Sequence, residues 1–184
     1  MKNPVKISIF SHMRGGKDTA AAYCMRKIGY PRIKLAYGDE LKRIYHDLFG
    51  YSKDVTKDRD GYQWFGQAMR ERNPRIWIEK LDPILQHSLA RRHSVFLTDM
   101  RQPNEYDHLK SNGFVMIKID TPKEIRIQRM LEAGEEVKEE YLSHDTESHI
   151  DSFEYDYVVK NDGSLDDLYE KLDEVMEAIE YESR

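Results

Sequence analysis

The chain has 184 residues and a formal net charge of −5, with 29 basic residues scattered among 34 acidic ones. This length suits one domain without disulfides, and the charge pattern excludes a basic face for duplex nucleic acid. No run approaches the roughly 18 apolar residues of a membrane span, the chain starts without a signal peptide, and the single Cys24 fits a reducing compartment, so we expect a cytoplasmic protein with no membrane partner.

The first predicted elements are a strand, a tight loop and a helix. The strand carries Val5, Ile7, Ile9 and Phe10, the loop reads S-H-M-R-G-G-K-D-T over 11–19, and a helix-forming stretch covers 20–28. A short strand over 32–37 follows, and then a helix from residue 38 whose apolar positions recur every three and four residues.

A long helical region, about 38–92, separates the second strand from the third. It contains an exposed polar connection over 50–61, a helix over about 62–72, and a second helix starting at Pro74, a good first-turn residue. A simple crossover needs only about 10 to 12 residues. The excess predicts a functional insertion.

The remaining elements alternate strand and helix. Strands are predicted at 94–98, 114–119 and 155–159, and helices at 103–112, after Pro122 and at 165–179, with an acidic irregular segment over 134–150. Five strands alternating with helices predict an α/β fold: a parallel sheet with helices on both faces, which binds ligands beyond the carboxyl ends of its strands.

The loop after the first strand is similar to the phosphate-binding pattern G-x-x-x-x-G-K-[ST]. Gly16 and Lys17 are in place, Ser11 replaces the first glycine, and Asp18 stands where a hydroxyl is expected, with Thr19 one residue late. Backbone amides and a helix N-terminus that converge on one concavity favour an anion. The alternative is an ordinary strand-to-helix turn with a surface lysine.

Two further candidates follow the third strand. Asp99 ends that strand, where a carboxylate could hold magnesium or its water shell, or could cap the helix that begins at Pro103. Arg101 would project toward the same crevice and could hold a phosphate with two hydrogen bonds. A solvated loop arginine is the alternative for Arg101.

Arg126 and Arg129 lie three residues apart on one predicted helix, so their side chains share a face. Such arginines can neutralise charge on a transferred phosphoryl group. On a wet surface they would only pair with Glu124 and Glu132, and spacing alone favours that alternative.

Two other clusters carry weaker signals. Arg70 lies among several arginines of the insertion and could bind the phosphate of an acceptor. His144, Glu147 and His149 have no partner cluster with zinc spacing, so we assign them to the irregular segment rather than to a metal site.

Five motifs together carry a family resemblance. They are G-K-D-T at 16–19, G-D-E-L-K at 38–42, W-F-G-Q-A-M-R at 64–70, T-D-M-R-Q-P-N-E at 98–105 and Y-D-Y-V-V-K-N-D-G-S-L-D-D-L at 155–168. In this order and spacing the chain resembles the phage-type deoxynucleoside monophosphate kinases, an adenylate-kinase-like branch of the P-loop fold. Ser11, Met100 and Gln102 depart from the pattern of that family.

The resemblance implies a three-layer P-loop kinase with a core (1–37, 93–133 and 151–184), an acceptor-binding insertion at about 38–92 and a small lid at about 134–150. It implies transfer of the γ-phosphoryl group of ATP, with Mg²⁺, to a (deoxy)nucleoside 5′-monophosphate, giving ADP and the diphosphate. Small-molecule nucleotides are then the partners, and a homodimer is compatible with the sequence.

The resemblance also assigns residues by position. Those implied to hold ATP are Arg14, Gly15, Gly16, Lys17, Asp18, Thr19, Asn161 and Gly163. Those implied to hold the acceptor are Asp39, Lys42, Arg70 and Arg101. Those implied to hold the metal are Asp18, Thr19 and Asp99, and those implied to act in catalysis are Lys17, Asp99, Arg126 and Arg129.

Two alternatives stay open at this point. One is a P-loop kinase of another small phosphorylated acceptor, such as a phosphomevalonate-like molecule. The other is a nucleotide-binding module that switches a partner protein and turns over poorly.

Overall fold

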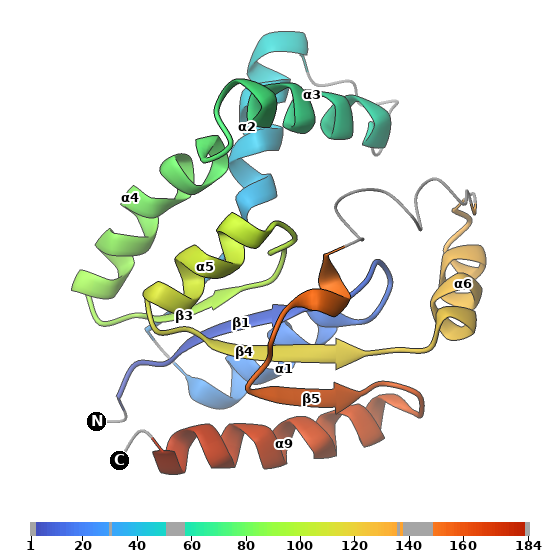
Figure 1. Cartoon of the computed structure of the whole chain (residues 1–184). Helices are drawn as coiled ribbons and strands as arrows, with labels where there is room; N and C mark the ends of the chain where they lie inside the picture. Colours follow the sequence, from blue (N-terminus) through green and yellow to red (C-terminus); the bar gives the residue numbers. More distant parts are fainter. Residues whose placement is uncertain (1–2, 30, 51–57, 136, 138–148, 183–184) are drawn as a thin grey trace.

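Five parallel strands form the centre of the protein, shown as a computed structural model that describes residues 3–29, 31–50, 58–135, 137 and 149–182 (Figure 1). The strands are β1 (Lys6–Phe10), β2 (Arg32–Leu35), β3 (Ser94–Leu97), β4 (Val115–Asp120) and β5 (Tyr157–Lys160). Their order is β2-β3-β1-β4-β5, and each neighbouring pair is parallel. β2 and β3 lie on one side of β1, and β4 and β5 lie on the other, so the order in which strands are added to the sheet reverses at β1. Sheets of this type bind ligands at that point.

Helices cover both faces of the sheet, as predicted. α1 (Lys17–Ile28) and α9 (Leu165–Glu182) pack on one face, and α4 (Ile76–Ala90) and α5 (Pro103–Ser111) pack on the other (Figure 1). Ile7 and Ile9 enter the core beneath α1 and α9, whereas Phe10 enters the opposite core. Alternating side chains along β1 therefore supply both cores.

Three helices lie between β2 and β3, in the region predicted as an insertion. They are α2 (Tyr37–Phe49), α3 (Arg59–Arg72) and α4; α2 begins just after the carboxyl end of β2, and α4 returns along one face of the sheet to the start of β3 (Figure 1). α6 (Lys123–Glu132) and a short 3₁₀ helix (Ile150–Ser152) lie at the carboxyl end of the sheet. Helical walls thus surround the end of the sheet where ligands are expected.

Several element bounds differ from the prediction for local reasons. α3 starts at Arg59 rather than near residue 62, because Asp58 caps it by accepting a hydrogen bond from the Gly61 amide at 3.0 Å. The predicted first-turn role of Pro74 is wrong, since α4 begins at Ile76 with Arg75 as its cap. The polar connection at 51–57 lies outside the described residues.

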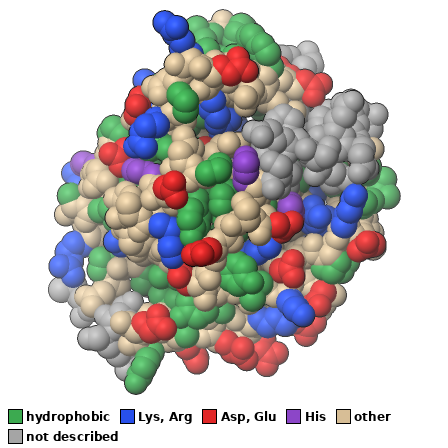
Figure 2. Space-filling model, viewed as in Figure 1, with side chains coloured by type: hydrophobic (Ala, Val, Ile, Leu, Met, Phe, Trp, Pro, Cys, Tyr) green, Lys and Arg blue, Asp and Glu red, His purple; other side chains and the backbone are tan. Residues whose placement is uncertain are grey.

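The hydropathy of the helices, the charge of the surface and the state of Cys24 can each be read from the structure. Within the described ranges, no helix is long and apolar enough to cross a membrane. On the face shown in Figure 2, basic and acidic side chains are interspersed. Cys24 is buried, and burial raises the pKa of its thiol to about 12, so the thiol stays protonated and inert.

Candidate active site

The loop between β1 and α1 curls tightly at the carboxyl end of β1. Gly16 adopts φ +94° and ψ 10°, and a Cβ added there would lie 2.5 Å from Nδ2 of Asn161. A Cβ on Gly15 would lie 2.7 Å from Oγ of Ser11. Both the left-handed backbone and the lack of space therefore require glycine at position 16.

The carbonyl group of Gly15 is turned into the protein. It accepts hydrogen bonds from Oγ1 of Thr121 at 2.8 Å and from Nδ2 of Asn161 at 2.9 Å. In a trans peptide the C=O and the following N–H point in opposite directions, so the N–H of Gly16 points outward. The first amides of α1, which lack acceptors within their helix, lie beside it. The loop therefore presents backbone donors suited to an anion.

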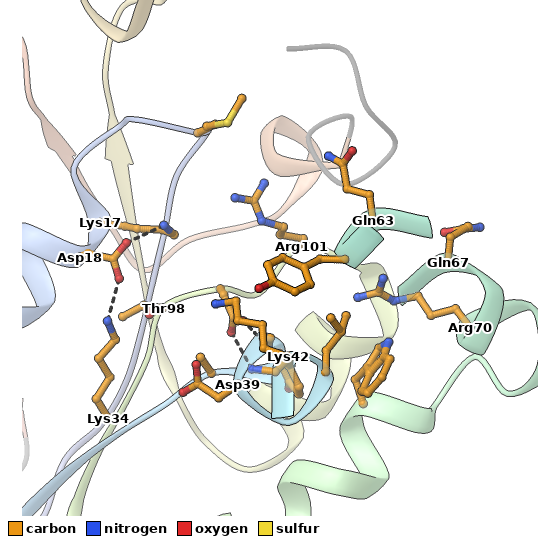
Figure 3. A pocket seen from close by; sticks show the side chains of 18 residues that line it. Lys17, Asp18, Lys34, Asp39, Lys42, Gln63, Gln67, Arg70, Thr98 and Arg101 are labelled. Carbon is orange, nitrogen blue, oxygen red and sulfur yellow. Dashed lines mark hydrogen bonds and ion pairs between the residues drawn. The ribbon is translucent and has the colours of Figure 1, made fainter. Parts of the chain in front are cut away.

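Lys17 is held by the residue that follows it. Its Nζ lies 2.8 Å from one oxygen of Asp18, and Nζ of Lys34 lies 2.7 Å from the other (Figure 3). Burial alone would raise the pKa of Asp18, but Lys17 and then Lys34 together lower it to about 2. Asp18 is therefore ionised at neutral pH, and the ammonium group of Lys17, which has three N–H donors, can bind a phosphate without leaving the carboxylate.

A cavity of about 660 Å³, here called the loop cavity, lies over this loop. Most of the residues predicted to hold ATP line it, namely Arg14, Gly16, Lys17, Asp18, Thr19, Asn161 and Gly163. Gly15 contributes through its inward carbonyl instead. The sequence prediction therefore selected residues that the fold brings together.

Of the two arginines on α6, Arg129 lines the loop cavity. It donates to the backbone carbonyl of Arg14 at 3.4 Å and to Oδ1 of Asn161 at 3.3 Å. Arg126 does not line the loop cavity, and it donates a hydrogen bond to the backbone carbonyl of Thr121 at 3.2 Å. The two arginines were predicted to share a face of the helix, but only Arg129 lines the loop cavity.

A second cavity of about 540 Å³, here called the helix cavity, lies between the loop and helices α2, α3 and α4 (Figure 3). It contains the four predicted acceptor residues, which are Asp39, Lys42, Arg70 and Arg101. Gln63 and Gln67, one helical turn apart on α3, also line it and were not predicted. In Figure 3, Arg101 projects between the loop and α3.

The two cavities share a boundary. Met13, Lys17, Asp18 and Arg101 line both of them. A ligand in the loop cavity and a ligand in the helix cavity would therefore meet at two cationic side chains. This arrangement suits transfer of an anionic group from one ligand to the other.

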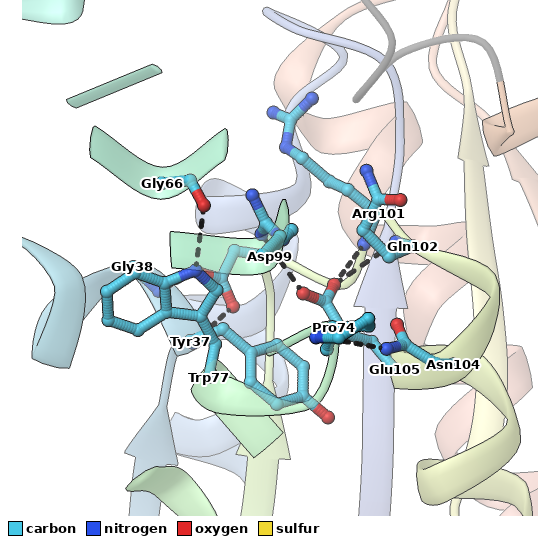
Figure 4. Close-up of polar contacts among 11 residues, drawn as sticks. Tyr37, Gly38, Gly66, Pro74, Trp77, Asp99, Arg101, Gln102, Asn104 and Glu105 are labelled. Atoms are coloured by element: carbon cyan, nitrogen blue, oxygen red, sulfur yellow. Dashed lines mark hydrogen bonds and ion pairs between the residues drawn. The ribbon is translucent and has the colours of Figure 1, made fainter. Parts of the chain in front are cut away.

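Asp99 lines the helix cavity but already has two backbone partners. Its carboxylate accepts hydrogen bonds from the amides of Tyr37, at 2.8 Å, and Gly38, at 2.6 Å (Figure 4). It therefore caps the start of α2, and the alternative cap of the helix at Pro103 is wrong. Burial raises the pKa of Asp99, against the effect of these hydrogen bonds. Its magnesium role stays a prediction.

Glu105 was not predicted as a site residue. Its buried carboxylate contacts the side chain of Arg70 and the backbone amides of Arg101 and Gln102. A sequence signal was present, since a glutamate three residues after a helix cap typically forms a capping box. That pattern predicts the bond to Gln102 but not the long-range one to Arg70.

Some predictions lie outside the described part of the chain. The structure does not describe residues 136 and 138–148. These residues include His144, Glu147 and most of the predicted lid. Among the residues that the structure does describe, no cluster of three or more His, Cys, Asp or Glu side chains could hold a metal ion. Asp18 and Thr19 supply oxygen atoms of the kind that magnesium prefers beside the loop cavity.

Several solved structures share this architecture, and two of the three described here are named as kinases. No protein-family model matches the chain. TT1252 from Thermus thermophilus aligns with 97% of this chain and 99% of its own, with a TM-score of 0.62 and 21% identity. Dephospho-CoA kinase from Campylobacter jejuni aligns with 97% and 98%, with a TM-score of 0.58 and 14% identity.

Shikimate kinase from Acinetobacter baumannii, in complex with shikimate, aligns with 97% of this chain and 94% of its own, with a TM-score of 0.54 and 12% identity. The fold is that of the P-loop kinases. In this fold the loop cavity lies at the loop between β1 and α1, and the helix cavity lies between that loop and α2 to α4 (Figures 1 and 3).

Two viral proteins are similar in sequence. A protein of Acanthamoeba polyphaga mimivirus, provisionally named a deoxynucleotide monophosphate kinase, is 24% identical over 197 residues, 91% of this chain and 94% of its own. The uncharacterised protein ORF77 of Ictalurid herpesvirus 1 is 27% identical over 123 residues, 66% of this chain and 53% of its own.

Proposed function

We propose that this protein transfers the γ-phosphoryl group of ATP to a (deoxy)nucleoside 5′-monophosphate, giving ADP and the diphosphate. The observation that carries the proposal is the meeting of the loop cavity and the helix cavity at Lys17, Asp18 and Arg101. The name of the mimivirus relative supports a deoxynucleotide as the acceptor.

The loop cavity suits the triphosphate of the donor. The outward amide of Gly16 and the start of α1 favour phosphate oxygens, and Lys17 and Arg129 add positive charge. Nζ of Lys17 lies 2.8 Å from Asp18 and has three N–H donors, so it can bind a phosphate oxygen while it keeps this contact. Asp18, ionised and beside the Thr19 hydroxyl, would hold Mg²⁺ there, directly or through water. When bound, the metal neutralises charge on the phosphates.

The helix cavity suits a nucleotide better than a small polar acceptor. Tyr37, Tyr62 and Trp77 give it aromatic walls, and Gln63 and Gln67 offer amide groups that can pair with the edge of a base. Its cationic groups Arg70 and Arg101 suit a terminal phosphate. These features favour a nucleoside monophosphate as acceptor.

Phosphoryl transfer requires correct positioning of donor and acceptor, and it does not require a general base. Phosphoryl transfer is accelerated mainly by in-line placement of donor and acceptor and by neutralisation of the charge on the transferred group. Lys17 and Arg101 at the boundary, with Arg129 beside them, would provide that neutralisation. We therefore assign no residue as a base.

The test is an acceptor panel. ATP and Mg²⁺ are mixed with each deoxy- and ribonucleoside 5′-monophosphate and with phosphomevalonate, and ADP release is measured. Release that depends on a nucleoside monophosphate supports the proposal. Release with phosphomevalonate alone would assign another acceptor, and ATP binding without acceptor-dependent release would indicate a switch module.

A further inference from the structure

Glu105 lies at the centre of the polar contacts behind the helix cavity. Its side chain is 3% exposed, and its Oε1 accepts a hydrogen bond from a terminal nitrogen of Arg70 at 3.2 Å. Its Oε2 accepts the backbone N–H groups of Arg101, at 2.9 Å, and Gln102, at 3.1 Å (Figure 4). One carboxylate therefore contacts both residues assigned to the acceptor phosphate.

The bond to Arg70 joins two separate parts of the fold. Arg70 belongs to α3, between β2 and β3, whereas Glu105 lies in the first turn of α5, after β3. The Arg70 side chain is 19% exposed and lines the helix cavity. The guanidinium group is planar, so a hydrogen bond to one of its nitrogens restricts the directions of its other N–H groups. An arginine side chain that is already held in this way loses less rotamer freedom when a ligand binds than an unrestrained one does.

The bond to the Arg101 amide acts through the backbone. It fixes the turn between β3 and α5, from which the Arg101 side chain extends into the boundary of the two cavities (Figure 3). Glu105 is too enclosed to contact a ligand phosphate directly. Its effect on such a ligand must run through the two arginines.

We propose that Glu105 is a positioning residue that holds Arg70 and the Arg101 backbone so that both guanidinium groups meet the phosphate of the acceptor nucleotide. The inference rests on the proposed function and deepens it. It predicts that the bond between Glu105 and Arg70 controls recognition of the acceptor and leaves recognition of ATP unchanged, because Arg70 lines the helix cavity and not the loop cavity.

A purely structural role is the competing explanation. Glu105 is also part of the capping box at the start of α5, together with Gln102. Glu105→Gln separates the two roles. Its amide oxygen can still accept the Arg101 and Gln102 N–H groups, whereas its NH₂ group cannot accept a bond from Arg70. Gln102→Ala is the matched control, because it weakens the capping box and leaves the Arg70 contact intact.

The experiment measures binding of each of the four deoxynucleoside 5′-monophosphates by isothermal titration calorimetry, with steady-state KM values for acceptor and ATP beside it. Glu105→Gln should weaken acceptor binding by about tenfold or more, the usual effect of losing a charge-assisted hydrogen bond. The KM for ATP should stay within about twofold of wild type. In an Arg70→Ala background, Glu105→Gln should have little further effect on the acceptor.

Each other outcome overturns the inference. Equal losses for acceptor and ATP, additive effects of the two substitutions, or the same loss in Gln102→Ala would assign Glu105 to the capping box alone. A Glu105→Gln protein that fails to fold while Arg70→Ala folds would do the same. If the wild-type protein binds none of the monophosphates, the proposed function fails and the inference fails with it; if it binds them and Glu105→Gln binds as tightly, only the inference fails.

Discussion

Replacing Gly16 by alanine tests the shape of the loop between β1 and α1. An L-residue at φ +94° lies in the left-handed region, at a cost of about 1–2 kcal/mol. The new Cβ would also lie 2.5 Å from Nδ2 of Asn161, so that side chain must move. Moving it weakens its bonds to Gly15 and Arg129, worth about 1 kcal/mol each. We expect Gly16→Ala to lower the free energy of unfolding by about 2–4 kcal/mol.

The assay is urea denaturation followed by circular dichroism, with ADP release measured in parallel. Gly134→Ala is the matched control, because Gly134 also has positive φ, +67°, and an added Cβ there would meet nothing within 4 Å. The control should show the backbone cost alone and keep its activity, whereas Gly16→Ala should lose about 100-fold in turnover as the amide donor is displaced. Equal losses of stability in the two variants would refute the collision with Asn161.

Four further substitutions test the site in three experiments. Lys17→Ala should abolish acceptor-dependent ADP release while the circular dichroism spectrum stays native; full activity would remove Lys17 from catalysis. Arg129→Ala should lower kcat more than Arg126→Ala, because Arg129 lines the loop cavity and Arg126 bonds to a backbone carbonyl; the reverse order in steady-state kinetics would contradict this placement. The folded-state pKa of Asp18, about 2, lies below its usual value, so its pairing stabilises the fold above roughly pH 4 and is lost as pH falls toward 2. Asp18→Asn should therefore flatten the fall in Tm over that range, and an unchanged fall would argue against the pairing.

The tight loop between β1 and α1 could be predicted because its signals are local. A strand, two glycines, a lysine and a helix follow one another within 5–28, and strand alternation predicted the parallel sheet. The same alternation placed Asp99 and Arg101 beyond a strand end. Residues close in sequence, or placed by the general rule for parallel sheets, were therefore accessible without the structure.

Contacts between distant segments could not be predicted in this way. The carboxylate of Asp99 caps a helix that begins 62 residues earlier, at Tyr37, because β2 and β3 are neighbours in the sheet. The resemblance implied that Asn161 holds ATP, but not that its buried side chain bonds to Gly15, 146 residues away. Glu105 contacts Arg70 across 35 residues. Each contact depends on strand order or helix docking, which no local pattern contains.

The inward carbonyl of Gly15 has a consequence for the energetics of donor binding. Thr121 and Asn161 follow the ends of β4 and β5, so two strands of the sheet hold this one peptide plane through hydrogen bonds within the protein. A loop that is already ordered loses little conformational entropy on binding. Under the proposed function, the loop would therefore bind the triphosphate of ATP at a small entropic cost.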